Sequence, residues 1–173
     1  MEKYRELEKK ISERKAVIGV VGLGYVGLPL VEGFIQGGFK VIGVDNNLQK
    51  VKSLNSGKSY VQDVSSETIK KMHKTKRLFI SGDFNNINKM DVIIICVPTP
   101  LRKSKDPDIS YILSALGEIT KRNYQGSLVI LESTTYPGTT EEILLPELSK
   151  DKLKVGKDFF LAFSPERVDP GNR

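Results

Sequence analysis

The order of apolar and polar positions along the chain predicts alternating strands and helices. Short apolar runs rich in β-branched and aromatic residues are typical of buried strands; they occupy residues 15–22, 39–45, 77–81, 91–98, 127–133 and 158–164. Between them lie segments with helical spacing of apolar residues, or with polar and helix-prone sequence, at 24–38, 47–57, 65–75, 108–122 and 138–150. This alternation predicts an α/β fold, with a doubly wound parallel sheet of about six strands and helices on both faces.

The first residues form a separate unit in this pattern. Tyr4, Leu7 and Ile11 recur at three- and four-residue spacing among charged residues, which predicts an exposed amphipathic helix within residues 1–14. We expect the remaining residues, 15–173, to form one domain, because a chain of 173 residues with 39% apolar content can bury a single core.

A glycine pattern stands at the turn from the first strand to the first helix. In "GVVGLGYVG", Gly22, Gly24 and Gly27 form G-x-G-x-x-G, and Asp45 ends the second strand 18 positions beyond Gly27. A strand before, a helix after and an acid at that distance are the context of the dinucleotide-binding fingerprint. We expect Gly22 to permit the tight turn, Gly24 to let the backbone approach a pyrophosphate, and Gly27 to let helix and strand pack closely. The fold is therefore predicted to be Rossmann-like.

The cofactor follows from the same residues. The phosphates would lie on the amide groups at the positive end of the helix, near Tyr25 and Val26. The Asp45 carboxylate can accept from both ribose hydroxyls of NAD, whereas a 2′-phosphate about 4 Å away would be repelled by about 4 kcal/mol at an effective dielectric near 20. Asn46 and Asn47 offer no guanidinium to accommodate that phosphate. We predict NAD, not NADP.

Polar side chains also follow the later strands. "VPTP" follows the fourth strand, "ESTTYPG" contains the end of the fifth, and "SPER" contains the end of the sixth. Ligands of open parallel sheets bind outside these strand ends, so Thr134 is a candidate functional residue. Two other residues are expected to act as helix caps, Asp108 for 108–122 and Thr139 for the helix that follows it.

Composition excludes several other functions. One cysteine and one histidine exclude an internal disulfide and make a Ser/His/Asp triad or a zinc site improbable, so we expect no metal. Cys96 is expected to be an inert core thiol and His73 a surface residue.

The net charge is +6, yet the basic cluster at 70–77 lacks stacking aromatics, so we expect no nucleic-acid partner. "SGKS" at 56–59 lacks the first glycine of a P-loop. With neither a signal peptide nor an apolar span, the protein is expected to be cytoplasmic, without a membrane partner.

Five motifs in order carry a family resemblance. "VGLGYVGLPL", "VIGVDNN", "CVPTPL", "ESTTYPGTT" and "FSPERVDPGN" resemble the N-terminal domain of the UDP-glucose/GDP-mannose dehydrogenase family over about residues 15–172. They look most like its UDP-N-acetylglucosamine 6-dehydrogenase branch. The resemblance implies oxidation of a sugar 6-hydroxyl to a carboxylate by two molecules of NAD, through an enzyme-bound thioester, and a homodimer built by a central helix.

The resemblance also implies roles for individual positions. The positions that match NAD contacts in the family are Tyr25, Val26, Asp45, Lys50, Thr99 and Thr134. Thr134 would also help to hold a catalytic water, and Glu166 would act in hydrolysis of the thioester. Glu166, Arg167 and Val168 match positions that contact the nucleotide sugar. Relatives that act on UDP-glucose carry a second glutamate where Pro170 stands, which counts against UDP-glucose.

The resemblance implies three further residues that lie beyond the matched region: the nucleophilic cysteine of the family, a lysine and an asparagine. Cys96 stands in the wrong motif to act as that nucleophile. We therefore expect the chain to be the cofactor-binding part of a longer dehydrogenase, one that binds NAD without turning over sugar. The alternatives are the corresponding part of a UDP-N-acetylmannosamine or UDP-glucose dehydrogenase, and a stand-alone NAD-binding module without catalysis. Another Rossmann dehydrogenase, such as a 6-phosphogluconate or prephenate relative, would leave "ESTTYPGTT" and "FSPERVDPGN" without a role.

Overall fold

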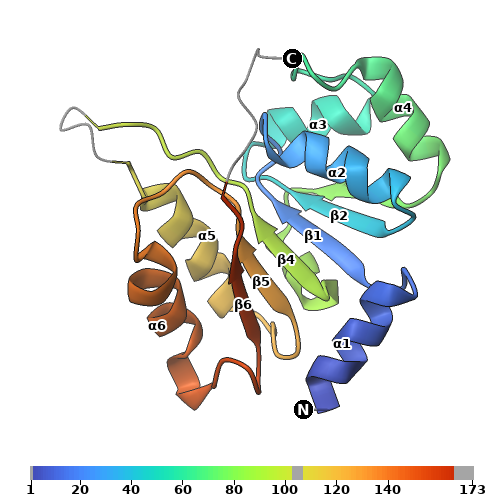
Figure 1. The fold of residues 1–173 in the computed structure, drawn as a ribbon. Helices are drawn as coiled ribbons and strands as arrows, with labels where there is room; N and C mark the ends of the chain where they lie inside the picture. Colours follow the sequence, from blue (N-terminus) through green and yellow to red (C-terminus); the bar gives the residue numbers. More distant parts are fainter. Residues whose placement is uncertain (1, 103–106, 166–173) are drawn as a thin grey trace.

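A computed structural model describes residues 2–102 and 107–165 (Figure 1). Its six strands form one parallel sheet in the order β3-β2-β1-β4-β5-β6. The strands are β1 (Val17–Val21), β2 (Lys40–Val44), β3 (Leu78–Ser81), β4 (Val92–Ile95), β5 (Leu128–Leu131) and β6 (Phe160–Phe163). The predicted doubly wound sheet is confirmed.

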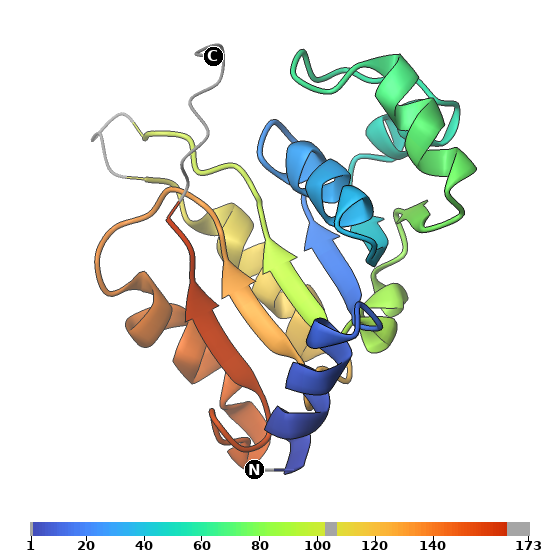
Figure 2. The ribbon, with the colours of Figure 1, turned by 45° about the vertical axis from the view of Figure 1, so that its right-hand side comes forward.

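Helices connect the strands and cover both faces of the sheet (Figures 1 and 2). The α-helices are α1 (Glu2–Ser12), α2 (Gly27–Gln36), α3 (Leu48–Asn55), α4 (Ser66–Lys74), α5 (Ser110–Thr120) and α6 (Leu145–Leu148). Two short 3₁₀ helices are η1 (Phe84–Lys89) and η3 (Lys150–Lys152), and a π-helical turn, η2 (Thr140–Leu144), precedes α6. None of the helices in the described part of the chain is long and apolar enough to cross a membrane.

The two faces of the sheet bury separate apolar clusters. In β1, Ile18 and Val20 face the cluster that contains the apolar residues of α2, α3 and α4. Val21 faces the opposite cluster with Ile93 and Ile95 of β4, beneath α5 and α6. Each such side chain contributes about 1.5–3 kcal/mol on burial. Burial on both faces explains why these strands read as continuous apolar runs.

Strand order places a crevice at the centre of the sheet. From β1 the chain passes through α2 to β2 on one side, whereas β4 pairs with β1 on the other side. Strand order therefore reverses between β1 and β4, and a ligand of such a sheet binds outside the carboxyl ends of these two strands.

The predicted amphipathic helix forms as α1, but it packs on the sheet. Leu7 is only 7% exposed and belongs to the α2-side cluster. The ring of Tyr4 meets that of Phe160 edge to face, with 5.8 Å between centroids. Lys10 Nζ lies 2.9 Å from Asp91 Oδ1, just before β4. The helix is thus attached to the strands' amino ends.

Three local predictions about helix ends are wrong. The Thr139 hydroxyl does not cap the helix that follows: it donates to the Tyr136 carbonyl and pairs with the Thr135 hydroxyl. That helical segment is also shorter than expected. It begins with a π turn, in which the Leu145 N–H donates to the Thr140 carbonyl, and Pro146 has no N–H and crowds the turn before it. Asp108 is not the cap of α5 either: Ile109 occupies that position without a side-chain hydrogen bond, and Asp108, one residue earlier, accepts from the Ser110 N–H at 3.0 Å.

His73 was predicted to lie on the surface, but its side chain is half-buried. Its Nε2 lies 2.9 Å from the Leu54 carbonyl oxygen, so the imidazole links α4 to the end of α3. Cys96 is buried, with 4% exposure, as expected of a core thiol.

Candidate functional site

The three glycines of the first loop face three different surroundings. Gly22 has φ +97°, and a Cβ there would lie 2.6 Å from the Cys96 carbonyl oxygen. A Cβ on Gly27 would lie 1.9 Å from the Gly22 carbonyl oxygen. A Cβ on Gly24 would have no heavy atom within 4 Å. Gly22 and Gly27 are therefore required by the fold itself, whereas space is left open only at Gly24.

The loop leads directly into the amino end of α2. The helical bonds begin with the Leu28 N–H, which donates to the Gly24 carbonyl at 3.0 Å. The first turn contains no acidic residue, and Val26 at the cap position provides no side-chain hydrogen bond. Helix amino ends leave N–H groups without intrahelical acceptors and carry a partial positive charge, so this end of α2 is suited to an anion.

Asp45 braces this loop from the end of β2. Asp45 is 7% exposed; its Oδ2 accepts from the Leu23 N–H at 2.9 Å, and its Oδ1 from the Asn47 N–H at 2.8 Å. The sequence indicated a ribose-binding acid, but gave no sign of these backbone bonds. Each carboxylate oxygen can accept a second hydrogen bond, so both roles are compatible.

A cleft of about 400 Å³ lies where strand order reverses. Its walls come from the carboxyl ends of β1, β2 and β4, from the start of α3, and from η1 and α5. The lining residues are Val21, Gly22, Val44, Asp45, Asn46, Asn47, Lys50, Phe84, Val97, Pro98, Tyr111, Ser114, Ala115 and Glu118. Apolar walls with a few convergent polar groups are typical of small-molecule sites.

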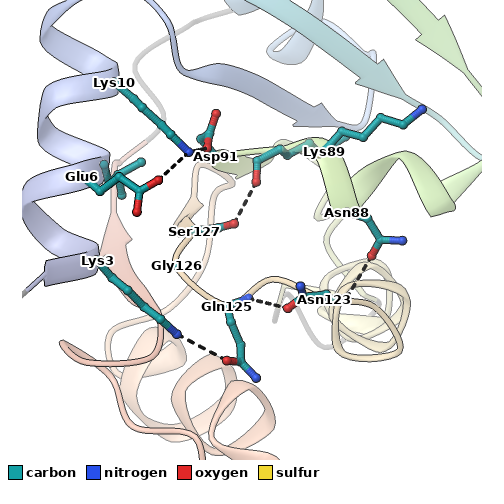
Figure 3. A pocket seen from close by; sticks show the side chains of 12 residues that line it. Lys3, Glu6, Lys10, Asn88, Lys89, Asp91, Asn123, Gln125, Gly126 and Ser127 are labelled. Carbon is teal, nitrogen blue, oxygen red and sulfur yellow. Dashed lines mark hydrogen bonds and ion pairs between the residues drawn. The ribbon is translucent and has the colours of Figure 1, made fainter.

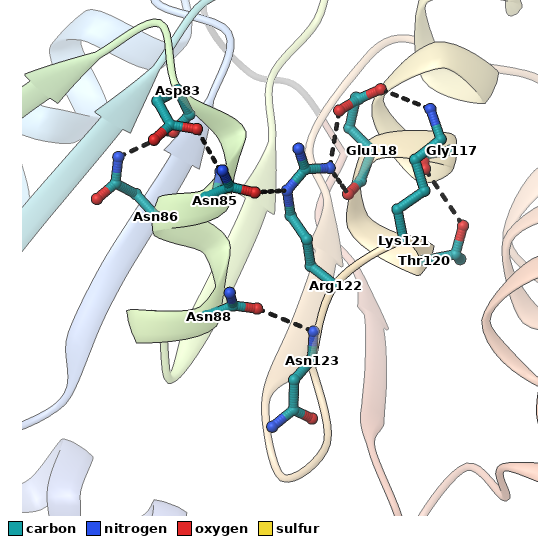
Figure 4. Close-up of polar contacts among 10 residues, drawn as sticks. All are labelled: Asp83, Asn85, Asn86, Asn88, Gly117, Glu118, Thr120, Lys121, Arg122 and Asn123. Carbon is teal, nitrogen blue, oxygen red and sulfur yellow. Dashed lines mark hydrogen bonds and ion pairs between the residues drawn. The ribbon is translucent and has the colours of Figure 1, made fainter.

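The far wall of the cleft is fixed by polar contacts between η1 and the end of α5 (Figure 4). Arg122 pairs with Glu118 at 2.8 Å and donates to Asn85 Oδ1 at 3.2 Å. Its guanidinium also lies 5.9 Å from the ring centroid of Phe84. Hydrogen bonds from Lys121 and Arg122 lower the pKa of the Glu118 carboxyl. These contacts hold Phe84 and Glu118 at the cleft.

The structure brings together some of the sequence-predicted site residues. Gly22, Asp45 and Lys50 line the cleft. Tyr25, 51% exposed, and Val26, half-buried, stand beside it at the amino end of α2. Thr99 and Thr134 follow β4 and β5, outside the cleft lining, whereas Glu166, Arg167 and Val168 lie outside the described residues.

The hydroxyl residues after β5 divide into structural and accessible ones. Ser133 is buried and donates to the Val97 carbonyl at 2.9 Å, which joins the ends of β5 and β4. Thr135 pairs with Thr139. Thr134 is exposed, and its hydroxyl has no hydrogen-bond partner within the described residues. Thr134, like the exposed Tyr136, is thus a hydroxyl residue of this segment that a ligand could reach.

One residue at the site was missed by sequence reasoning. The Tyr60 hydroxyl donates to the Leu23 carbonyl at 2.5 Å, and its ring centroid lies 5.5 Å from Lys50 Nζ. Tyr60 belongs to an irregular connection after α3 and to no recognisable motif. Only its position in space reveals its contact with the glycine loop.

A second cavity, of about 170 Å³, lies at the opposite end of the sheet, between α1 and the loops before β4 and β5 (Figure 3). Several of its polar side chains are paired: Lys3 with Gln125 at 3.3 Å, and Lys10 with Asp91 at 2.9 Å. It lies at the strands' amino ends, where ligands of open parallel sheets do not bind.

Comparison with known proteins identifies the family. Residues 16–173 match the model of the UDP-glucose/GDP-mannose dehydrogenase family, NAD binding domain. The chain therefore belongs to this family, as its NAD-binding domain, and its cofactor is NAD. The resemblance seen in the sequence is confirmed.

Named relatives include two kinds of amino-sugar dehydrogenase. The UDP-N-acetyl-D-glucosamine 6-dehydrogenase of Pseudomonas aeruginosa is 38% identical over 159 residues, which are 90% of this chain and 36% of the relative. The UDP-N-acetyl-D-mannosamine dehydrogenase of Pyrococcus horikoshii is 38% identical over 157 residues, 89% of this chain and 37% of the relative. The chain thus spans little more than a third of the length of these relatives.

Solved structures give the same result. The UDP-D-ManNAc dehydrogenase of Pyrococcus horikoshii superposes with a TM-score of 0.82 at 37% identity, over 90% of this chain and 37% of that one. A GDP-mannose dehydrogenase of Pseudomonas aeruginosa gives 0.81 at 32% identity, over 88% and 36%. An imine reductase of Aspergillus terreus, with a TM-score of 0.58 at 10% identity, shares only the fold.

Proposed function

We propose that this chain is the NAD-binding part of a dehydrogenase that oxidises the 6-hydroxyl of a UDP-N-acetylhexosamine to a carboxylate. The observation that carries the proposal is the open space at Gly24, on a loop braced by Asp45 and followed by an uncapped helix end. A backbone that is crowded at Gly22 and Gly27 but open at Gly24 is what an approaching diphosphate requires.

Each cofactor contact is assigned from this geometry and from the family resemblance. The amides of the loop and of Tyr25 and Val26 receive the diphosphate, and Asp45 accepts from the adenosine ribose hydroxyls. Lys50 supplies a positive charge at the cleft. Thr99 and Thr134, at the ends of β4 and β5, hold the nicotinamide half.

Bound NAD supplies the hydride acceptor, and the protein must supply position and proton handling. Thr134, as an exposed hydroxyl after β5, is assigned to the NAD site and to orienting a catalytic water. By family resemblance, Glu166 acts in hydrolysis of the thioester, and Glu166, Arg167 and Val168 contact the nucleotide sugar.

The sugar is assigned by the motifs "CVPTPL" and "SPERVDPGN", which favour UDP-N-acetylglucosamine. UDP-N-acetylmannosamine is the second candidate, because relatives of equal identity carry that name. UDP-glucose is the weakest of the three candidate substrates, because Pro170 stands where relatives that act on UDP-glucose carry a second glutamate.

The chain as given is expected to bind NAD without oxidising sugar. Its one cysteine, Cys96, is buried next to β4 and cannot serve as the thioester nucleophile. By family resemblance, the nucleophile for the thioester step and the central helix for the homodimer lie outside the matched region, which is 36–37% of the relatives' length.

A calorimetric titration of the 173-residue chain with NAD and with NADP tests the cofactor assignment. We expect NAD to bind and NADP to bind at least a hundredfold more weakly, because of Asp45. Equal affinities would contradict the role given to Asp45. Absorbance at 340 nm, followed with NAD and each of the three UDP-sugars, should stay flat for this chain, and NADH formation would refute the predicted inactivity.

A further inference from the structure

The hydroxyl of Tyr60 holds the glycine loop from a distant part of the chain. It donates to the carbonyl oxygen of Leu23 at 2.5 Å, although 37 positions separate the two residues. Tyr60 lies in the connection between α3 and α4, so neither of the elements that the loop joins provides this contact. The loop is therefore held on one side by Asp45 and on the other by Tyr60.

These two contacts fix the orientation of consecutive peptide groups. The Leu23 N–H donates to Asp45, the Leu23 carbonyl accepts from Tyr60, and the Leu23 side chain is fully buried. In a trans peptide the carbonyl and the following N–H point in opposite directions. With the Leu23 carbonyl directed at Tyr60, the Gly24 N–H must point away from it. No acceptor for this N–H is found among the described residues.

The ring of Tyr60 has a second contact. Lys50 Nζ lies 5.5 Å from the ring centroid, within the range of a cation–π interaction. Lys50 lines the cleft. One side chain thus contacts both a backbone carbonyl of the glycine loop, through its hydroxyl, and an ammonium group at the cleft, through its ring.

The phenol is suited to be a permanent donor. Burial, together with the negative charge of Asp45, raises the pKa of Tyr60 above its ordinary value. The hydroxyl therefore keeps its proton throughout the range in which the protein would work, and its bond to the Leu23 carbonyl does not depend on pH there.

We propose that Tyr60 is a positioning residue for the diphosphate of NAD: it presets the Gly24 N–H through Leu23 and orients Lys50 through its ring. This inference rests on the proposed function of the glycine loop. It assigns to Tyr60 no contact with the cofactor itself.

The test compares Tyr60→Phe with Tyr124→Phe. Tyr124 is a matched control, because its hydroxyl also donates to a backbone carbonyl, that of Leu148 at 2.6 Å, but in the core beneath α6. Tyr60→Phe should weaken binding of NAD and of ADP-ribose about threefold to tenfold, the effect of one neutral hydrogen bond. Adenosine, which lacks the diphosphate, should bind both variants as it binds the wild type. Tyr60→Leu, which also removes the ring, should lower the affinity for NAD further than Tyr60→Phe does.

The outcomes separate the two proposals. If the wild-type chain binds neither NAD nor ADP-ribose, the proposed function fails and the inference fails with it. If the wild type binds and Tyr60→Phe binds equally well, only the inference fails. Equal losses in Tyr60→Phe and Tyr124→Phe, or an equal loss for adenosine, would show general loosening and overturn the positioning role.

A measurement on the wild type covers the case in which Tyr60→Phe does not fold. The Gly24 amide and the Tyr60 hydroxyl proton are followed by NMR during titration with ADP-ribose and with adenosine. Both resonances should move with ADP-ribose and stay in place with adenosine. Resonances that do not move with ADP-ribose would overturn the inference.

Discussion

Replacing Gly24 by alanine separates binding from folding, because a methyl group there meets no protein atom. A Cβ at this position has no heavy atom within 4 Å, and the backbone is outside the left-handed region. The substitution should leave stability unchanged or raise it by about 0.4–1 kcal/mol, through the less flexible unfolded chain. Gly27→Ala is the contrasting variant, because its Cβ would lie 1.9 Å from the Gly22 carbonyl oxygen. Such overpacking costs about 1–3 kcal/mol or more.

Gly24→Ala, the variant that should keep its stability, should nevertheless bind NAD more weakly. The methyl group of Gly24→Ala would occupy the space through which the diphosphate approaches, and it would remove at least one charge-assisted hydrogen bond. Such a bond contributes about 1.5–3 kcal/mol, so affinity should fall roughly tenfold to hundredfold. Chemical denaturation gives the stabilities, and calorimetric titration with NAD gives the affinities. A Gly24→Ala chain that binds NAD like the wild type, or that is as unstable as Gly27→Ala, would contradict the role given to the open space at Gly24.

Three further predictions concern carboxylates. Asp45→Asn should lower the affinity for NAD and reduce the ratio of the NAD affinity to the NADP affinity, which two parallel titrations would measure. An unchanged ratio would contradict repulsion between Asp45 and the 2′-phosphate of NADP. Asp91→Ala should lower the free energy of unfolding by about 1–3 kcal/mol, because the Val17 N–H loses its acceptor. Lys10→Met should lower it by at most about 1 kcal/mol, because the ammonium group of Lys10 is largely solvated. If chemical denaturation gave the same loss of unfolding free energy for Asp91→Ala and Lys10→Met, the role given to the Val17 hydrogen bond would be wrong. The pKa of Asp108 is lowered from 3.8 to about 2 by a backbone N–H and a neighbouring guanidinium, so its stabilising effect is present above about pH 4 and is lost as the pH falls toward 2. An NMR titration of this carboxyl with a midpoint near 3.8 would disagree.

Much of the fold could be predicted from the sequence, because buried parallel strands produce continuous apolar runs. The run "DVIIICVP" needed no further information, since both of its faces are covered. The glycine loop and Asp45 were also identifiable, because their spacing follows from the geometry of a strand, a turn and a helix.

The local details could not be predicted, because they depend on neighbours in space. Thr139 has the chemistry of a helix cap, but its hydroxyl has closer partners in Tyr136 and Thr135. The contact of Tyr60 with Leu23 joins residues 37 positions apart, and no pattern marks such a pair. The half-burial of His73 likewise results from the packing of α4 against α3.

We propose that NAD binds on the glycine loop, at the carboxyl ends of β1 and β2. The most direct test is an NMR titration of the isotope-labelled chain with NAD, followed through its backbone amides. We predict that the largest shifts fall on residues 22–27 and 45–50. Shifts concentrated on residues 88–91 and 123–127, around the cavity beside α1 (Figure 3), would place the cofactor at the opposite end of the sheet and contradict binding on the glycine loop.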